Sequence, residues 1–425
     1  MTDLRTSKTR SIVFLNRFYW PDVAATGQML TDLAEDLAAR GWDVTVVTSA
    51  GDYRGASGSL AREETRAGVR ILRVRGTGFG RYNMVGRLAD YVSYLTGALA
   101  RVLRLGRRDV VVAMSDPPFL AVVAVTAARL TGAHSVYWVQ DLFPQIAARL
   151  GVMSERSLIY RASDRVARWL NRRCDLVIAL GPRMARALVS AGARKERTTY
   201  VHNWADSSAI RPVDRANNPF VHEQGLDDRF VVLYSGNAGR AHPFGAVLHA
   251  ARALRADDGV VFMFIGDGKR FPELKATAER EGLRNVRFLD YLPREKLSFS
   301  LSAASVSLVT EDPEVEGLLV PSKTYGILSS GRPLIFVGSP ASDVACIVAE
   351  ADCGVVVSPD DGDGLVRAIA ALRDDPARLA KLGANARRAA EQTYDRRHAT
   401  GRWADIVLAT TGSAEAALSL QPQEA

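Results

Sequence analysis

The sequence is poor in cysteine, with three such residues in a chain of 425. Cys174, Cys346 and Cys353 are odd in number, and no two of them form a CxxC pair. This argues against a disulfide framework and against a structural zinc site, and it fits a reducing compartment.

Long hydrophobic runs are also missing. The first apolar run covers only residues 12–15, which is too short for the core of a secretory signal peptide. The most apolar later stretch, residues 119–128, is about half as long as a helix that spans a bilayer must be. We therefore expect a cytoplasmic protein without a transmembrane helix.

The overall composition is that of an ordinary globular protein. Hydrophobic residues make up 47% and charged residues 24% of the chain, which excludes a disordered or collagen-like protein. The length of 425 residues predicts two or three domains. The formal net charge of +8 fits either a solvated basic surface or an acidic partner, such as a phosphate-bearing ligand, nucleic acid or an anionic membrane face.

From residue 11 onward, short β-branched runs alternate with longer segments of helical period, which predicts βα units and parallel sheets. The alternation stops at residues 203–229, where Pro, Asn and small polar residues gather, and then restarts. We predict an α/β fold of two doubly wound, Rossmann-like domains. The expected parts are residues 1–205, a linker at 206–229, a second domain at 230–394, a helix at 395–412 and a disordered tail at 413–425.

The expected strands of the first half are residues 12–16, 43–48, 69–74, 109–113, 135–139, 176–179 and 198–201. Those of the second half are residues 230–235, 260–265, 286–289, 306–309, 333–337 and 354–357. Ligands of doubly wound sheets bind at the carboxyl ends of the strands, so a cleft between the two domains is the expected site.

Two candidate positions follow strands of the first half. The turn after the first strand ends in Thr26-Gly27, which opens a helix whose N–H groups and dipole can receive a phosphate; a simple loop is the alternative. The turn lacks G-x-G-x-x-G, which weakens a dinucleotide-dependent oxidoreductase. Asp141 directly follows a buried strand, where it either faces the ligand or caps the next helix.

The second half has two glycine-rich turns at the same predicted sheet edge. The first reads SGNAGRAHPF, where Gly236 and Gly239 let the backbone approach a ligand and Arg240 can neutralise a diphosphate. The second reads IGDGKR and contains Gly266 and Asp267. Two such turns together favour a ligand site over two ordinary loops.

The most distinctive stretch covers residues 311–338. Ser322 is expected to cap a helix that runs to Ser330, which places Lys323 in the first turn. A cation is unfavourable there for helix stability, so Lys323 is expected to meet an anion of a ligand. Of the four acids before the helix, Glu316 is the candidate site residue; Glu311, Asp312 and Glu314 are expected to form a solvated acidic loop.

A further segment, residues 155–173, has the pattern of an amphipathic helix. Its arginines suit an anionic membrane surface or a polyprenyl phosphate, and a solvated face is the alternative. The apolar face comprises Leu158, Ala162, Val166, Trp169 and Leu170, and the adjacent basic stripe comprises Arg161, Arg165, Arg168 and Arg172.

Taken together, these segments resemble the GT-B nucleotide-sugar glycosyltransferases, specifically the retaining family four and its bacterial surface-polysaccharide branch, which includes fucosyl- and N-acetylfucosaminyl-type transferases. The resemblance covers roughly residues 11–410. It rests on the order and spacing of FYWPDVAATGQ, WVQDLFP, YSGNAGRAHPF, IGDGKR and, above all, EGLLVPSKTYGILSSGRP.

The resemblance implies that a sugar moves from a nucleoside diphosphate donor, held by the C-terminal domain, to an acceptor held mainly by the N-terminal domain. The anomeric configuration would be retained by front-face attack, and the acceptor would be a polyprenyl-diphosphate-linked saccharide at the inner face of the plasma membrane. Arg240 and Lys323 would offset the charge of the diphosphate, so no divalent metal and no cofactor is expected. Nucleic acid is not an expected partner. The C-terminal helix would cross back to the first domain.

The same resemblance assigns roles to the candidate residues. Asp141 and Glu316 would be catalytic, and the Thr26-Gly27 turn would line the acceptor or the diphosphate. The donor-binding residues would be Gly236, Asn237, Arg240, Gly266, Asp267, Ser322 and Lys323.

Three departures from the family pattern matter. The usual His before Asp141 is Gln140, an expected Arg and Lys are replaced by Asn237 and His242, and the second Glu of a Glu-x7-Glu pair is Gly326. Two alternatives therefore stay open beside the transferase. One is a sugar-nucleotide epimerase of the same architecture, and the other is a nucleotide-sugar-binding protein without catalytic activity.

Overall fold

The computed structural model describes residues 9–22, 24–50, 60–77, 79 and 84–412. The chain folds into two compact units. Unit 1 comprises residues 1–148, 153–201 and 400–425, and unit 2 comprises residues 149–152 and 202–399. The expected tail at 413–425 lies outside the described residues.

Unit 1 is built on an eight-stranded sheet with the order β3-β4-β2-β1-β5-β6-β7-β8. All neighbouring strands are parallel except β3 and β4. The antiparallel edge strand β3 was not expected from the sequence, because its residues EETR lack a hydrophobic alternation. The strands are β1 (Ser11–Leu15), β2 (Asp43–Ser49), β3 (Glu63–Arg66), β4 (Val69–Val74), β5 (Val110–Met114), β6 (His134–Trp138), β7 (Leu176–Ala179) and β8 (Thr198–Tyr200).

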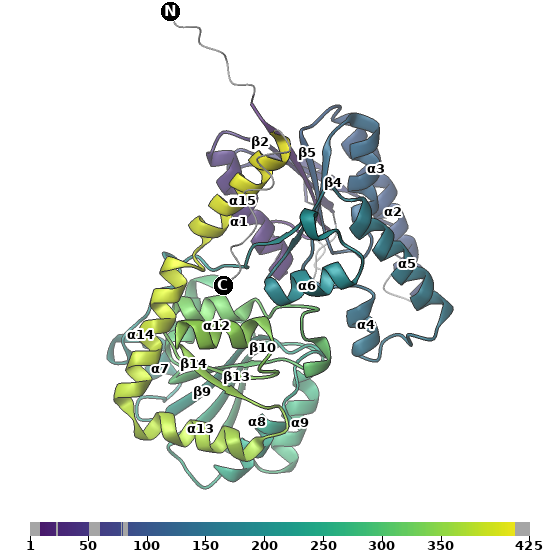
Figure 1. Ribbon diagram of the computed structural model, residues 1–425. Helices are drawn as coiled ribbons and strands as arrows, with labels where there is room; N and C mark the ends of the chain where they lie inside the picture. Colours follow the sequence, from purple (N-terminus) through teal and green to yellow (C-terminus); the bar gives the residue numbers. More distant parts are fainter. Residues whose placement is uncertain (1–8, 23, 51–59, 78, 80–83, 413–425) are drawn as a thin grey trace, which may run out of the picture. The chain divides into compact units, whose positions relative to one another are not determined.

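Helices connect these strands, as the βα pattern predicts (Figure 1). Gly41 stops the first of them in a left-handed conformation, with φ of 86°, that glycine adopts without strain. The helices are α1 (Ala25–Ala39), α2 (Met84–Arg104), α3 (Ala121–Thr131), α4 (Gln145–Arg149), α5 (Leu158–Arg173) and α6 (Pro182–Ser190).

Unit 2 is built on a six-stranded, wholly parallel sheet with the order β11-β10-β9-β12-β13-β14. Its strands are β9 (Phe230–Asn237), β10 (Val260–Asp267), β11 (Val286–Leu289), β12 (Val306–Thr310), β13 (Leu334–Val337) and β14 (Gly354–Val357). Its helices are α7 (Pro219–Glu223), α8 (Gly245–Ala253), α9 (Phe271–Arg280), α10 (Leu297–Ser302), α11 (Lys323–Ser329), α12 (Asp343–Ala351), α13 (Gly362–Asp374) and α14 (Pro376–Gln392).

Both faces of the unit 2 sheet are buried. Val232 and Tyr234 of β9 pack into a core with α8, α9 and α13, whereas Val231 and Leu233 pack into a second core with α7 and α10. This is why β9 and β10 are nearly unbroken apolar runs rather than alternating ones.

The expected linker at 206–229 is wrong, because these residues belong to unit 2. They contain α7, and Val221 and Leu226 lie in the second core with no exposed surface. The many polar residues of the segment hid this role. Asn218, for example, caps α7 by accepting a hydrogen bond from Phe220 N at 3.0 Å.

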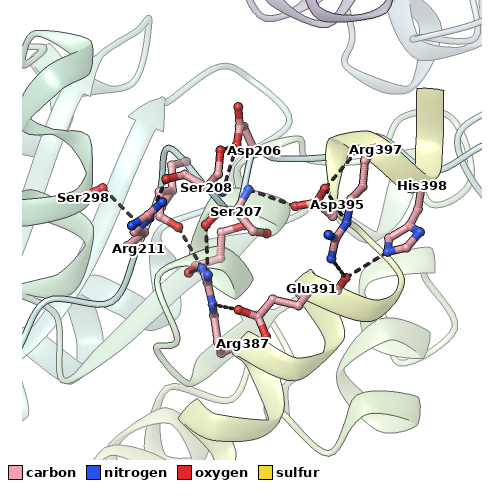
Figure 2. A network of polar contacts seen from close by, with 12 residues as sticks. Asp206, Ser207, Ser208, Arg211, Ser298, Arg387, Glu391, Asp395, Arg397 and His398 are labelled. Carbon is pink, nitrogen blue, oxygen red and sulfur yellow. Dashed lines mark hydrogen bonds and ion pairs between the residues drawn. The ribbon is translucent and has the colours of Figure 1, made fainter. Parts of the chain in front are cut away.

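A polar network within unit 2 holds the segment around Ser207 against α14 (Figure 2). The Arg387 guanidinium donates to the carbonyl oxygens of Ser207 at 2.9 Å, Ile210 at 2.8 Å and Ser329 at 2.6 Å. Asp395 accepts a hydrogen bond from Ser207 N at 3.1 Å. Because Ser329 is the last residue of α11, the network fixes the helix that begins with Lys323.

The last helix, α15 (Arg396–Thr411), begins in unit 2 and continues in unit 1 from Thr400. Within unit 1 the Trp403 ring is fully buried and meets the Trp138 ring edge-on at 4.8 Å between centroids. The expected return of a C-terminal helix to the first domain is therefore confirmed. Of the helices in the described part of the chain, none combines the length and the apolar composition that crossing a bilayer requires.

Candidate functional site

The carboxyl edge of the unit 2 sheet is shaped by paired glycines. Gly236, the last residue but one of β9, lies beside Gly266 of β10, and their φ angles are 128° and 136°. A Cβ on Gly266 would lie 2.3 Å from Gly236 O, so only glycine allows the two strand ends to approach this closely. The order of the sheet reverses between β9 and β12, which is where doubly wound sheets bind ligands.

Lys323 lies at this edge. Its Nζ donates hydrogen bonds to the Tyr234 hydroxyl and, at 3.3 Å, to the carbonyl oxygen of Asn237. Nζ also lies 3.8 Å from the centroid of the Tyr234 ring, a cation–π contact. Among the described residues, no carboxylate pairs with Lys323. A half-buried cation without a counter-ion is costly, and an anion bound here would remove that cost.

The pKa values of Lys323 and of the neighbouring His242 are both lowered at this edge. Burial lowers the pKa of Lys323 well below its usual value. Burial, with Lys323 adding to the effect, lowers the pKa of His242 to about 3. His242 is therefore neutral, and its Nδ1–H donates to the Thr310 carbonyl at 2.6 Å. His242 supplies no second positive charge to the site.

The other predicted donor residues lie on the same edge but make fewer contacts. Asn237 pairs in register with Asp267, whose carbonyl accepts from Ala238 N at 2.8 Å, and both side chains are exposed. Arg240 is exposed and makes no hydrogen bond or ion pair among the described residues. Ser322 precedes α11 with helical backbone angles and makes no capping hydrogen bond, so its expected capping role is wrong.

The acidic residues before α11 differ in burial, and not in the way that the sequence predicts. Glu311 is 1% exposed and is not part of a solvated loop. Burial, together with Asp343, Glu316 and Asp312, raises its pKa well above the usual value. Glu316 accepts a hydrogen bond from the Ser339 hydroxyl. At the position of the missing family Glu, a Cβ on Gly326 would meet methyl groups at 3.7–3.8 Å, so that position faces apolar side chains.

Unit 1 has its own switch point, between β1 and β5. Asp116 follows β5, and its carbonyl accepts from Arg17 N at 3.0 Å. Asp141 follows β6, and its backbone N–H donates to the Ser115 hydroxyl at 3.2 Å. Burial raises the pKa of both carboxyl groups to about 6. The positive charge of Arg17 partly lowers the pKa of Asp116. The negative charge of Asp116 raises the pKa of Asp141 further. The Asp141 side chain is nevertheless open to solvent.

The Thr26-Gly27 turn lies at the start of α1. Thr26 Oγ1 is 3.5 Å from Asn16 Nδ2, which also donates to Phe18 O at 2.7 Å. A Cβ on Gly27 would meet the Phe18 backbone at 3.2 Å, so the turn is closely packed. The end of β1 is therefore bordered by polar side chains, Asn16 and Thr26, that contact each other.

Comparison with known proteins assigns both units. Residues 25–204 match the family described as "Glycosyl transferase 4-like domain", and residues 217–389 match "Glycosyl transferases group 1". The chain belongs to the group 1 glycosyltransferases. The two Rossmann-like units are accordingly the two domains of a GT-B fold, as predicted.

Individual proteins similar to this chain are also named as glycosyltransferases. WbjE of Pseudomonas aeruginosa, named as a glycosyltransferase, is 28% identical over 292 residues, which are 68% of this chain and 72% of that protein. WcaI of Escherichia coli (strain K12), a glycosyl transferase named for colanic acid biosynthesis, is 24% identical over 89% of this chain and 95% of its own. The structure of Alr3699/HepE from Anabaena in complex with UDP and glucose has a TM-score of 0.72 at 20% identity, covering 93% of this chain and 99% of its own.

The sequence analysis did not select two residues that the contacts of the structure place at the two strand edges, Tyr234 beside Lys323 and Asp116 beside Arg17. Tyr234 was expected only as part of a strand, although its place directly before the glycine turn is a usable signal. Asp116, which follows β5, was not among the predicted site residues. In the described part of the chain, no group of three or more His, Cys, Asp or Glu residues is placed to hold a metal ion.

Proposed function

We propose that this glycosyltransferase moves a sugar from a nucleoside diphosphate donor to a polyprenyl-diphosphate-linked saccharide, with retention of the anomeric configuration, in the synthesis of a bacterial surface polysaccharide. The proposed donor site rests on Lys323, a cation beside the glycine edge of unit 2 that has no carboxylate partner among the residues that the structure describes. The complex of HepE with UDP and glucose and the name of WcaI support the donor class and the polysaccharide.

The role of Lys323 is to neutralise the diphosphate. When the anion binds, the ammonium form is favoured, because a nearby negative charge reverses the lowering of the Lys323 pKa by burial. Arg240 is exposed and forms no ion pair with any described residue, so it can turn toward the same group. Together they stabilise the negative charge that builds up as the bond between the sugar and the phosphate breaks.

The acceptor is proposed to react on the same face of the sugar from which the diphosphate leaves. The acceptor oxygen forms the new bond to the anomeric carbon, the old bond to the phosphate oxygen breaks, and the acceptor proton passes to the leaving phosphate. Asp141 and the Thr26-Gly27 turn are proposed to orient the acceptor, and Glu316 is proposed to orient the donor sugar. The enzyme would work in the cytoplasm, at the inner face of the plasma membrane.

The first prediction concerns donor binding. We expect Lys323→Met to weaken the binding of UDP or the matching nucleoside diphosphate about 10- to 100-fold, because a charge-assisted contact contributes about 1.5–3 kcal/mol. Arg240→Ala is expected to weaken it by about tenfold. Isothermal titration calorimetry measures both, with exposed Lys275→Met as the matched control. Unchanged affinity in both variants would contradict the diphosphate assignment.

Turnover tests the acceptor and the stereochemistry. Labelled donor is incubated with and without polyprenyl-diphosphate-linked saccharides, and the new linkage is identified by NMR. Transfer only in the presence of acceptor, with retained configuration, is the expected result. Conversion of the donor alone would indicate an epimerase, and an inverted linkage would contradict the proposed front-face attack.

A further inference from the structure

The helix α5 of unit 1, labelled in Figure 1, bears exposed arginines and exposed apolar side chains. The helix contacts the core through Ala167, Leu170 and Asn171, which are its buried residues. Most of its other residues are exposed on the surface. We name this surface the α5 face; its arginine stripe is Arg161, Arg165, Arg168 and Arg172, and its apolar stripe is Leu158, Ile159, Val166 and Trp169.

The apolar stripe stays exposed in the part of the chain that the structure describes. Leu158 is 79% and Ile159 is 68% exposed, and Val166 and Trp169 are each 40% exposed. Of the apolar face expected from the sequence, only Leu170 lies in the core. Large apolar side chains gathered on one exposed helix face mark a surface that meets a membrane or a partner.

The arginine stripe is largely uncompensated. Among the described residues, Arg161, Arg165 and Arg172 form no ion pair. Arg168 pairs with Asp164, with Nε and Oδ2 2.7 Å apart. An open groove of about 1230 Å³ runs along this stripe, and Asp164 is the sole acid among its lining residues.

A smaller pocket of about 250 Å³ continues the positive surface. It is lined by Arg129, Arg173, Arg194 and Arg197 in addition to Arg172. Among the described residues that line it, Asp175 is the only acid, and its Oδ1 is 3.5 Å from Arg197 Nη1. Guanidinium groups that converge without enough carboxylates to neutralise them suit a phosphate, such as that of a lipid head group.

We propose that the α5 face docks on an anionic lipid bilayer. The apolar stripe would enter the boundary between head groups and acyl chains, and the arginines would lie among the lipid phosphates. The exposed Leu158 and Ile159 favour a bilayer over nucleic acid, which offers such side chains no apolar phase. The net positive charge disfavours a second copy of the same face. The inference rests on the proposed function only in that the acceptor is lipid-linked.

Flotation with lipid vesicles tests the docking without any donor or acceptor. The full chain is expected to bind phosphatidylcholine vesicles that contain phosphatidylglycerol, and to bind pure phosphatidylcholine far more weakly. The combined change Arg161→Ser, Arg165→Ser and Arg172→Ser should weaken partitioning about 100-fold, since each basic residue near an anionic surface contributes about fivefold. Leu158→Ser with Ile159→Ser should weaken it at least tenfold.

A matched triple variant of exposed arginines in unit 2, Arg280→Ser, Arg284→Ser and Arg294→Ser, removes the same charge and should leave partitioning unchanged. Equal vesicle binding by both triple variants would overturn the proposal. Binding to a DNA duplex that is unaffected by Leu158→Ser with Ile159→Ser, or a dimer in sedimentation that this pair disrupts, would overturn it in favour of another occupant. Donor binding is measured separately on the same variants. If the proposed donor does not bind, the vesicle result still stands, because flotation uses neither donor nor acceptor.

Discussion

Asp116 and Asp141 are two acids of unit 1 whose surroundings raise the pKa of the carboxyl group. Both have a pKa of about 6, above the value of 3.8 for an ordinary aspartate. The folded state therefore holds their protons more tightly than the unfolded state does. The stability that this contributes is fully present below about pH 4 and is lost as the pH rises through about 6.

We expect Asp116→Asn to reduce this pH dependence. The wild-type free energy of unfolding should fall between pH 4 and pH 7 by roughly 1 kcal/mol more than that of the variant, because solvent at a half-buried carboxyl reduces the full linkage effect. Urea unfolding at the two pH values measures the difference. Glu196→Gln, at an exposed position of unit 1, is the control. A parallel pH dependence in wild type and Asp116→Asn would refute the assignment.

At the residue scale the sequence predicted Lys323 for a sound reason, since a cation in the first turn of a helix has no local benefit. It could not predict that Glu311 is buried, because an acid in a run of acids looks solvated. Only the packing of the β12 end against its neighbours places Glu311 inside. The Tyr234 ring beneath Lys323 is likewise a product of distant segments meeting.

Among the elements, β9 and β10 shape the glycine edge of unit 2 through their parallel register. Gly236 stands opposite Gly266, and Asn237 stands opposite Asp267. This register is fixed by the apolar residues of both strands, which are buried on both faces. The glycines then allow the strand ends to continue side by side without a collision.

Gly266→Ala should damage this edge. The new Cβ would lie 2.3 Å from Gly236 O, and the φ of 136° disfavours any residue with a Cβ. We expect unit 2 to lose about 3 kcal/mol of stability in chemical denaturation. Gly245→Ala, whose Cβ would meet nothing within 4 Å at the start of α8, should change stability by less than about 0.5 kcal/mol. Similar effects of the two substitutions would count against the close approach.

The helices and strands themselves were largely foreseeable, because hydrophobic periodicity and turn residues act locally. Two elements were not. The β3 strand has no hydrophobic pattern of its own and is held by pairing with β4. The α7 helix is short and is set in a polar segment, and its place is decided by the core it joins.

For the whole molecule, the return of the chain to unit 1 makes that unit depend on the last helix. Trp403 is fully buried against Trp138, although the two lie far apart in the sequence. Trp403→Ala should therefore reduce the stability of unit 1 by about 3–5 kcal/mol, the usual effect of removing a buried aromatic ring. Scanning calorimetry of the full chain measures it. Trp169→Ala, at a 40% exposed position, is the control and should cost less than about 1 kcal/mol; equal losses would argue against a structural role for α15.

The sequence by itself determined the two doubly wound units, the order of their strands along the chain and the membership of a glycosyltransferase family, because periodicity, turns and motif order are properties of short segments. Only the tertiary structure decided which charges lack partners and which apolar stripe stays exposed. Three features depend on what distant segments bring to them: the raised pKa values of Asp116 and Asp141, and, within the described part of the chain, the lack of a carboxylate beside Lys323 and the exposure of the α5 face. Burial and charge compensation are set by three-dimensional neighbours, which the order of residues does not reveal.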